Sequence, residues 1–307
     1  MFVAPVVAGA LYIRQHSGLV AVAGTAATHA RSTWSMLALI LALSAFPMAA
    51  WTLGAAANQS LPLFRTTQVE LAGTFVNRIA PNGIGRAVVS GRFLVTRGLR
   101  SDQAAAAVAA TVVAGLIVHT GGIVFTASLG GVGSIHHLPT LKRPVALAAA
   151  VLVAVAVAGW AVVRRTDRTG RIGFWPRSVA RQFVGVLHDP VRSCRVLGGV
   201  LAATILTILA FWASMNAVAP TTLLPAATIY LIGTAVSNIA PAPGGIGVTE
   251  AALTTGLVMT GMPAGTSLAG VLIFRLVSFW LPTLLGGVSW LWLWRSKSLG
   301  GSGRSRL

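Results

Sequence analysis

Long apolar runs alternate with short polar connections along most of this chain. The clearest runs occupy five ranges, which are 34–56, 102–129, 145–163, 196–218 and 264–294. Each has close to the about 20 residues that an α-helix needs to cross the hydrocarbon core of a bilayer. The runs are too long and too unpatterned for barrel strands, and lipid offers no partner for a free backbone group. The pattern predicts an all-α polytopic transmembrane bundle of about six spans plus two broken hairpins.

Composition supports the same fold class. Hydrophobic residues make up 55% of the chain and charged residues only 9%, and the mean hydropathy is +0.80. A soluble domain of this size would carry about 25% charged residues. The shortage of charged side chains therefore excludes a water-soluble surface.

The chain is strongly basic, with 23 Lys and Arg against 5 Asp and Glu and a formal net charge of +18. In a soluble protein this balance would indicate a nucleic-acid partner. Here the basic residues lie between the apolar runs, eight of them within 164–195, and no aromatic–basic motif accompanies them. We therefore expect no nucleic acid, and the positive-inside rule places 164–195 and the C-terminal tail in the cytoplasm.

Two stretches of the chain resemble each other. Residues 61–85 match residues 223–247, and in both an Asn, Asn77 or Asn238, is followed by Ile-Ala-Pro and then by Gly-Ile-Gly. Proline and glycine at this density cannot lie within an uninterrupted helix, so the chain must break there. Each repeat is therefore predicted to contain a hairpin of two short helices broken by a Pro/Gly loop. We expect the two asparagines to cap the breaks.

This similarity divides the chain into parts. The expected parts are an unassigned N-terminal segment (1–33), repeat one (34–129), a connecting span with a basic loop (130–195), repeat two (196–294) and a basic tail (295–307). Repeats one and two, with the connection between them, form one transmembrane domain over 34–294.

The distribution of arginine suggests that the two repeats are inverted. Between residues 57 and 101 there are six arginines, whereas between 219 and 263 there is neither Lys nor Arg. Re-entrant hairpins would leave three crossings between the repeats, and an odd number inverts the second repeat relative to the first. A plain serpentine in which 62–79 and 248–261 span the membrane also keeps the basic clusters inside, so both topologies remain open.

Paired, broken hydrophobic segments are the best sequence pointer to a transporter's substrate site, because unwound backbone at membrane depth survives only where it lines a cavity. Arg78 and Arg86 flank the first break, and the helix that begins near Arg86 directs its positive end at the same space. Ionisable groups at membrane depth are costly unless paired or functional. Glu250 and Arg275 are therefore expected to form an ion pair, to bind a lipid headgroup, or both. The predicted substrate-binding residues are Arg78, Gly83, Gly85, Arg86, Pro243, Gly244, Gly245, Gly247, Glu250 and Arg275.

These residues carry a resemblance to a known family. The segment 241–287, with its motif PGGIGVTE at 243–250 followed by Arg275, looks like the transmembrane domain of the lysylphosphatidylglycerol synthase and flippase family. The segment NRIAPNGIGRA at 77–87 adds to the likeness, which extends over about 34–294. We expect a protein of the bacterial plasma membrane, with the cytoplasmic C-terminus that the basic tail indicates. The resemblance implies movement of aminoacylated or otherwise modified lipids between leaflets, and the expected partner is an anionic or aminoacylated phospholipid.

The chain departs from bifunctional relatives that carry a soluble transferase domain. Its longest polar connection, 164–193, is too short for such a domain, and the five acids form no Asp-x-Asp motif. We therefore predict no catalytic residue, cofactor or metal site, and a flippase-like function that moves or binds a lipid. Two alternatives are a membrane-embedded transferase acting on a lipid carrier and a non-transporting partner of a separate lipid-modifying enzyme. His119, inside an apolar run, is expected to make an interhelical hydrogen bond.

Overall fold

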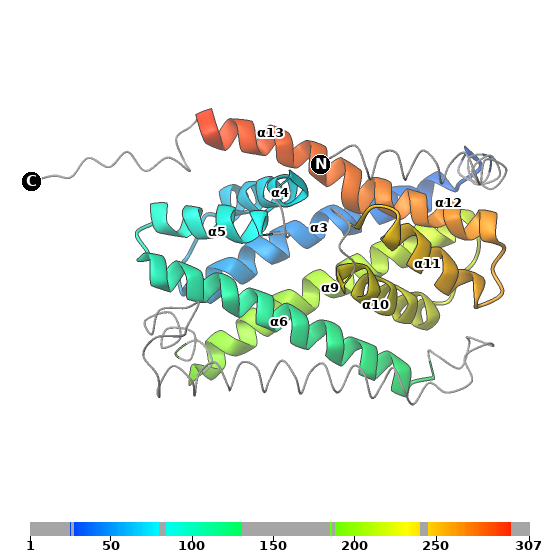
Figure 1. The fold of residues 1–307 in the computed structure, drawn as a ribbon, viewed down its shortest axis with the longest axis horizontal. Helices are drawn as coiled ribbons and strands as arrows, with labels where there is room; N and C mark the ends of the chain where they lie inside the picture. Colours follow the sequence, from blue (N-terminus) through cyan, green and yellow to red (C-terminus); the bar gives the residue numbers. More distant parts are fainter. Residues whose placement is uncertain are drawn as a thin grey trace, which may run out of the picture. The chain divides into compact units, whose positions relative to one another are not determined.

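The computed structural model of this chain describes residues 25, 28–79, 84–130, 185, 188–239 and 245–295. Over these residues the secondary structure is helical and contains no strand, which confirms the all-α fold (Figure 1). The helices are α3 (Ser32–Ala57), α4 (Leu63–Ile79), α5 (Gly85–Thr96), α6 (Ser101–Ser128), α9 (Pro190–Val218), α10 (Leu223–Ile239), α11 (Val248–Val258), α12 (Ala264–Arg275), the π-helical segment η3 (Leu276–Trp280) and α13 (Leu281–Arg295).

Four described helices are long and apolar enough to cross a membrane. They are α3, α6, α9 and the continuous helix Ala264–Arg295, and they match four of the five apolar runs. The fifth run, 145–163, lies outside the described residues. Large apolar side chains such as Ile40, Val112 and Phe125 are exposed on these helices, as contact with lipid requires.

Helix α9 begins earlier than its apolar run, at Pro190 instead of residue 196. Asp189 caps it: its Oδ1 accepts hydrogen bonds from the backbone N–H groups of Val191 and Arg192, each at 3.1 Å. Proline at the first helical position after an Asp cap is a common helix start. Arg192 and Arg195 therefore belong to the helix rather than to the polar connection before it.

The described residues fall in two compact units. The first-hairpin unit takes its described residues from within Phe46–Val118, Ala150–Ala203 and Pro282–Leu307, and so contains α4 and α5. The second-hairpin unit takes them from within Met1–Ala45, His119–Ala149 and Thr204–Leu281, and so contains α10 and α11. Each predicted hairpin therefore folds within its own unit.

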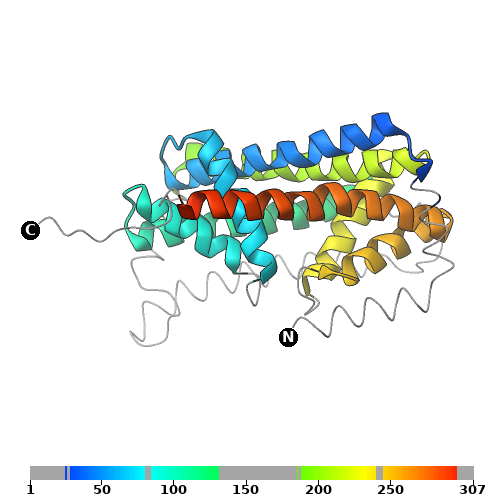
Figure 2. The ribbon, with the colours of Figure 1, turned by 90° about the horizontal axis from the view of Figure 1, so that it is seen from above.

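Helices α3 and α9, which precede the two hairpins, pack antiparallel within each unit (Figure 2). In the second-hairpin unit, Arg31 donates its backbone N–H to the Ala217 carbonyl at 2.9 Å. In the first-hairpin unit, Gly199 lies against Trp51 and Thr52. The beginning of α3 thus meets the end of α9, and the end of α3 meets the beginning of α9. Inverted repeats require that α3 and α9 run in opposite directions. The inversion itself and the re-entrant topology remain predictions.

Both hairpins break where the Pro/Gly pattern predicts. Helix α4 ends at Ile79 and α5 begins at Gly85, whereas α10 ends at Ile239 and α11 begins at Val248. The first helix has 17 residues in both hairpins. The second helix has 12 residues in the first hairpin and 11 in the second.

Glycine is required at these breaks for two different reasons. A Cβ on Gly85 would lie 2.6 Å from the backbone of Val76 and Asn77, so α5 starts in direct contact with the α4 backbone. Gly245 and Gly247 instead adopt positive φ angles of 66° and 85°, a region that disfavours side chains.

The last apolar run is one continuous helix with a π turn inside it. Across Leu276–Trp280 the hydrogen bonding widens, and the Leu281 N–H bonds to the Leu276 carbonyl five residues earlier. Pro282 follows directly. Proline has no N–H to donate, and its ring clashes with the carbonyl four residues before it, so a wider turn relieves the helix.

Candidate functional site

In the second hairpin, Glu250 and Arg275 form the ion pair that the sequence predicts. Glu250 lies in the first turn of α11, and its Oε2 accepts the backbone N–H of Gly247 at 2.7 Å. Its Oε1 accepts a hydrogen bond from Arg275 Nε at 2.6 Å. One carboxylate therefore both caps the helix that follows the break and holds an arginine from α12.

Arg275 is buried, with 6% of its surface exposed. Its guanidinium carbon lies 3.9 Å from the centroid of the Phe279 ring, a cation–π contact formed across the π turn. Its Nη2 atom is also buried and has no hydrogen-bond partner within the described ranges. An unmet buried donor costs about 1–3 kcal/mol, so an acceptor oxygen placed beside Nη2 would stabilise this position.

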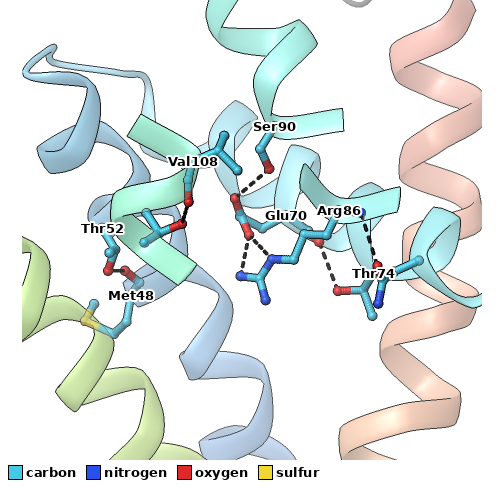
Figure 3. Close-up of polar contacts among 9 residues, drawn as sticks. Met48, Thr52, Glu70, Thr74, Arg86, Ser90 and Val108 are labelled. Atoms are coloured by element: carbon cyan, nitrogen blue, oxygen red, sulfur yellow. Dashed lines mark hydrogen bonds and ion pairs between the residues drawn. The ribbon is translucent and has the colours of Figure 1, made fainter. Parts of the chain in front are cut away.

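In the first hairpin, Glu70 and Arg86 form a second ion pair (Figure 3). Arg86 Nε lies 2.7 Å from Glu70 Oε2, and Arg86 Nη2 lies 2.5 Å from the same oxygen. Ser90 Oγ donates to Glu70 Oε1 at 3.2 Å. The Glu70 side chain is 4% exposed and that of Arg86 is 50% exposed. The carboxylate is thus the buried member here, whereas in the second hairpin the arginine is the more buried.

This pair was not predicted from the sequence, in which Arg86 is one of the predicted substrate-binding residues and Glu70 is not. The two residues are 16 positions apart, a separation that no helical spacing indicates. A Cβ on Gly73 would lie 3.1 Å from Arg86 Cγ, so Gly73 makes room for the arginine. The available signal was that an acid in a hairpin predicted to enter the membrane needs a partner.

Short polar contacts hold each pair of hairpin helices together. Asn77 Oδ1 accepts the backbone N–H of Arg86 at 3.4 Å, which agrees with its expected capping role. In the second hairpin, the buried hydroxyls of Ser237 and Thr249 lie 2.5 Å apart, while Asn238 is exposed. The two breaks thus look alike in sequence but are linked by different side chains.

Comparison with known protein families matches residues 2–286 to the lysylphosphatidylglycerol synthase transmembrane region. The chain belongs to this family. It is also 36% identical over 67 residues to a UPF0104 membrane protein of Pyrococcus horikoshii, and this match covers 22% of the chain and 20% of that relative. The family and the long apolar helices together make the chain an integral membrane protein of a lipid-related family.

For this member of the lysylphosphatidylglycerol synthase transmembrane family, the structure locates most of the predicted site residues. Gly247, Glu250 and Arg275 come together in one unit, with Gly245 beside them in the same loop. Gly85 and Arg86 begin α5 in the other unit, and Arg78 is partly buried in the last turn of α4. Gly83, Pro243 and Gly244 lie outside the described residues. That both groups of residues bind the same lipid stays a prediction.

His119 makes the interhelical contact predicted for it. Its Nε2 lies 2.9 Å from the Leu231 carbonyl oxygen of α10, and because a carbonyl only accepts, Nε2 is the donor. Gly122 lies close to the same leucine. Among the described residues, no three His, Cys, Asp or Glu side chains are grouped to hold a metal ion.

Proposed function

We propose that this protein is a flippase-like carrier that binds a phospholipid with an anionic or aminoacylated headgroup and moves it between leaflets. The observation that carries the proposal is the buried Arg275, which Glu250 holds through Nε while its Nη2 donor stays unmet. Membership in a lipid-related membrane family supports the same function.

The barrier that such a carrier must lower is the cost of taking a charged headgroup out of water, which reaches several kcal/mol. A phosphate oxygen that accepts from Arg275 Nη2 would leave the Nε bond to Glu250 in place. The lipid therefore does not have to break a buried ion pair in order to bind. Loss of that pair would leave an uncompensated buried charge, which is far more costly.

Arg86 offers a second, more accessible cation in the other unit. Its side chain is half exposed while it remains paired with Glu70. A guanidinium has five N–H donors, and the structure commits only its Nε and Nη2 to the Glu70 carboxylate. The remaining donors are available to a phosphate that approaches from the exposed side.

The test is lipid transfer by the purified protein alone in vesicles, measured as the share of a labelled phospholipid that a membrane-impermeant quencher reaches. The variant Arg275→Lys keeps a charge for Glu250 but removes the Nη2 donor, and Arg86→Gln removes the exposed cation. We expect either change to slow transfer and the combination to slow it further. Arg92→Gln, at an exposed position of the same helix α5, is the matched control and should transfer normally.

Two outcomes would contradict the proposal. In the first, the double variant, shown by gel filtration to be folded, would transport lipid as fast as the wild type. In the second, vesicles that contain the wild-type protein would show no transfer above empty vesicles for any phospholipid or polyprenyl lipid. The second result would favour a non-transporting partner of a separate lipid-modifying enzyme.

A further inference from the structure

A polar cavity of about 220 Å³ lies in the first-hairpin unit, where the end of α3, the beginning of α6 and the beginning of α9 meet. It shares no residue with either ion pair. Its described polar lining includes Asn58 and Gln59 after α3, Gln103 in the first turn of α6, and Arg192 in the first turn of α9, and the described apolar lining residues are Ala57, Leu99 and Ala106.

The backbone conformation at the end of α3 shapes one side of this cavity. Asn58 has a φ of 52°, and the N–H groups of Asn58 and Gln59 bond back to the carbonyls of Ala55 and Gly54 at 3.1 Å. This is a Schellman arrangement, which ends α3 and directs the chain away from it. The amide side chains of both residues are thereby held at the cavity.

Among the described residues of the lining, Arg192 alone carries a charge. Its Nη2 donates to the Ala56 carbonyl at the end of α3. Its Nε is buried without a hydrogen-bond partner among the described residues. Asp189 lies nearby in sequence, but its Oδ1 accepts two backbone N–H groups at the start of α9. Within the described part of the chain, this guanidinium therefore keeps its Nε donor without an acceptor.

The other polar groups among the described lining residues are amide side chains, which can both donate and accept hydrogen bonds. Gln103 Oε1 accepts the Arg100 N–H at 3.1 Å, which leaves its NH₂ group for a ligand. The cavity volume equals about seven water molecules at roughly 30 Å³ each. It is smaller than the 300–1,000 Å³ typical of drug-sized ligands. One cation surrounded by amides in this volume suits a single negative charge with adjoining hydroxyl groups.

We propose that this cavity binds the phosphodiester of an anionic phospholipid headgroup, such as phosphoglycerol, with Arg192 as the phosphate ligand. The amides of Asn58, Gln59 and Gln103 contact the polar remainder of the headgroup. The acyl chains stay outside, against the apolar surface of the helices. Binding here does not depend on transport, so the site can be tested even if the carrier proposal fails.

The experiment is native mass spectrometry of the full chain in detergent, titrated with short-chain phosphatidylglycerol. A hydrogen bond to a charged group contributes about 1.5–3 kcal/mol, so we expect Arg192→Gln to weaken binding at least roughly tenfold. Arg195→Gln is the matched control, because it removes the same charge from an exposed position one turn along α9. This control should bind like the wild type.

Because Arg192 also caps α3, a second variant leaves that contact intact. Gln103→Glu keeps an acceptor for the Arg100 N–H and places a carboxylate in the cavity, so it should weaken phosphatidylglycerol binding as strongly as Arg192→Gln. Equal affinities for the wild type, Gln103→Glu and Arg192→Gln would overturn the site. Glycerol 3-phosphate that competes as strongly as the lipid at equal concentration would overturn the lipid assignment.

Discussion

Arg275 and Glu250 lie 25 residues apart in sequence, yet Arg275 Nε and Glu250 Oε1 are 2.6 Å from each other. Their side chains are 8% and 18% exposed, so the pair lies almost completely out of solvent. A buried charge that loses its partner is strongly destabilising, whereas replacement of both charges is often tolerated. The two residues should therefore behave as one energetic unit.

Single replacements, Glu250→Gln or Arg275→Gln, are expected to lower the free energy of unfolding by about 3 kcal/mol or more. The double replacement should recover part of that loss, because it leaves no unpaired charge. Unfolding of the purified protein in mixed micelles measures all three variants. Additive losses would show that the two side chains act independently.

The Glu70–Arg86 pair should respond asymmetrically. The Glu70 side chain is 4% exposed and the Arg86 side chain is 50% exposed, so Arg86→Gln strands a buried carboxylate while Glu70→Gln strands an arginine that water can reach. We expect Arg86→Gln to cost about 3 kcal/mol and Glu70→Gln about 1 kcal/mol. Thermal unfolding of both variants in one detergent shows which of them loses more stability. The reverse order would contradict the burial difference on which the prediction rests.

The contact between α13 and α4 should tolerate a methyl group at one glycine and not at its neighbour. A Cβ on Gly286 would collide with the Leu71 carbonyl oxygen and lie 3.0 Å from Phe75 Cβ. A Cβ on Gly287 would meet only the edge of the Phe75 ring at 3.4 Å. Gly286→Ala should therefore lower the unfolding free energy by about 3 kcal/mol, since a helix carbonyl cannot move aside. Gly287→Ala should be near neutral in the same unfolding measurement, and equal losses would argue against the close contact.

If the two repeats are inverted, the loops that precede the two hairpins lie on opposite sides of the membrane. Ser60 and Thr222 occupy exposed positions in these loops, and the exposed Cys194 must first be replaced by Ser. With a membrane-impermeant maleimide, Thr222→Cys should label in intact cells and Ser60→Cys only after permeabilisation. Labelling of both from the same side would favour the serpentine topology, in which four crossings separate the two positions.

Much of this fold can be predicted from the sequence because the relevant signals are local. Run length and the absence of charge identify α3, α6 and α9, since only a helix satisfies the backbone in lipid. Proline and glycine locate both breaks, since they act on the conformation of their own residues. The pairing of Glu250 with Arg275 was also predictable, because each charge needed a partner at its depth.

The tertiary structure alone decided the partner of Glu70 and the surroundings of Arg192. Glu70 finds Arg86 because Gly73 and Gly85 let α4 and α5 approach closely, and that approach depends on packing that no spacing in the sequence reveals. Arg192 lines a cavity because three chain segments far apart in sequence meet there. Helix boundaries and breaks follow from neighbouring residues, whereas ion pairs and cavities depend on contacts that form only when distant helices pack together.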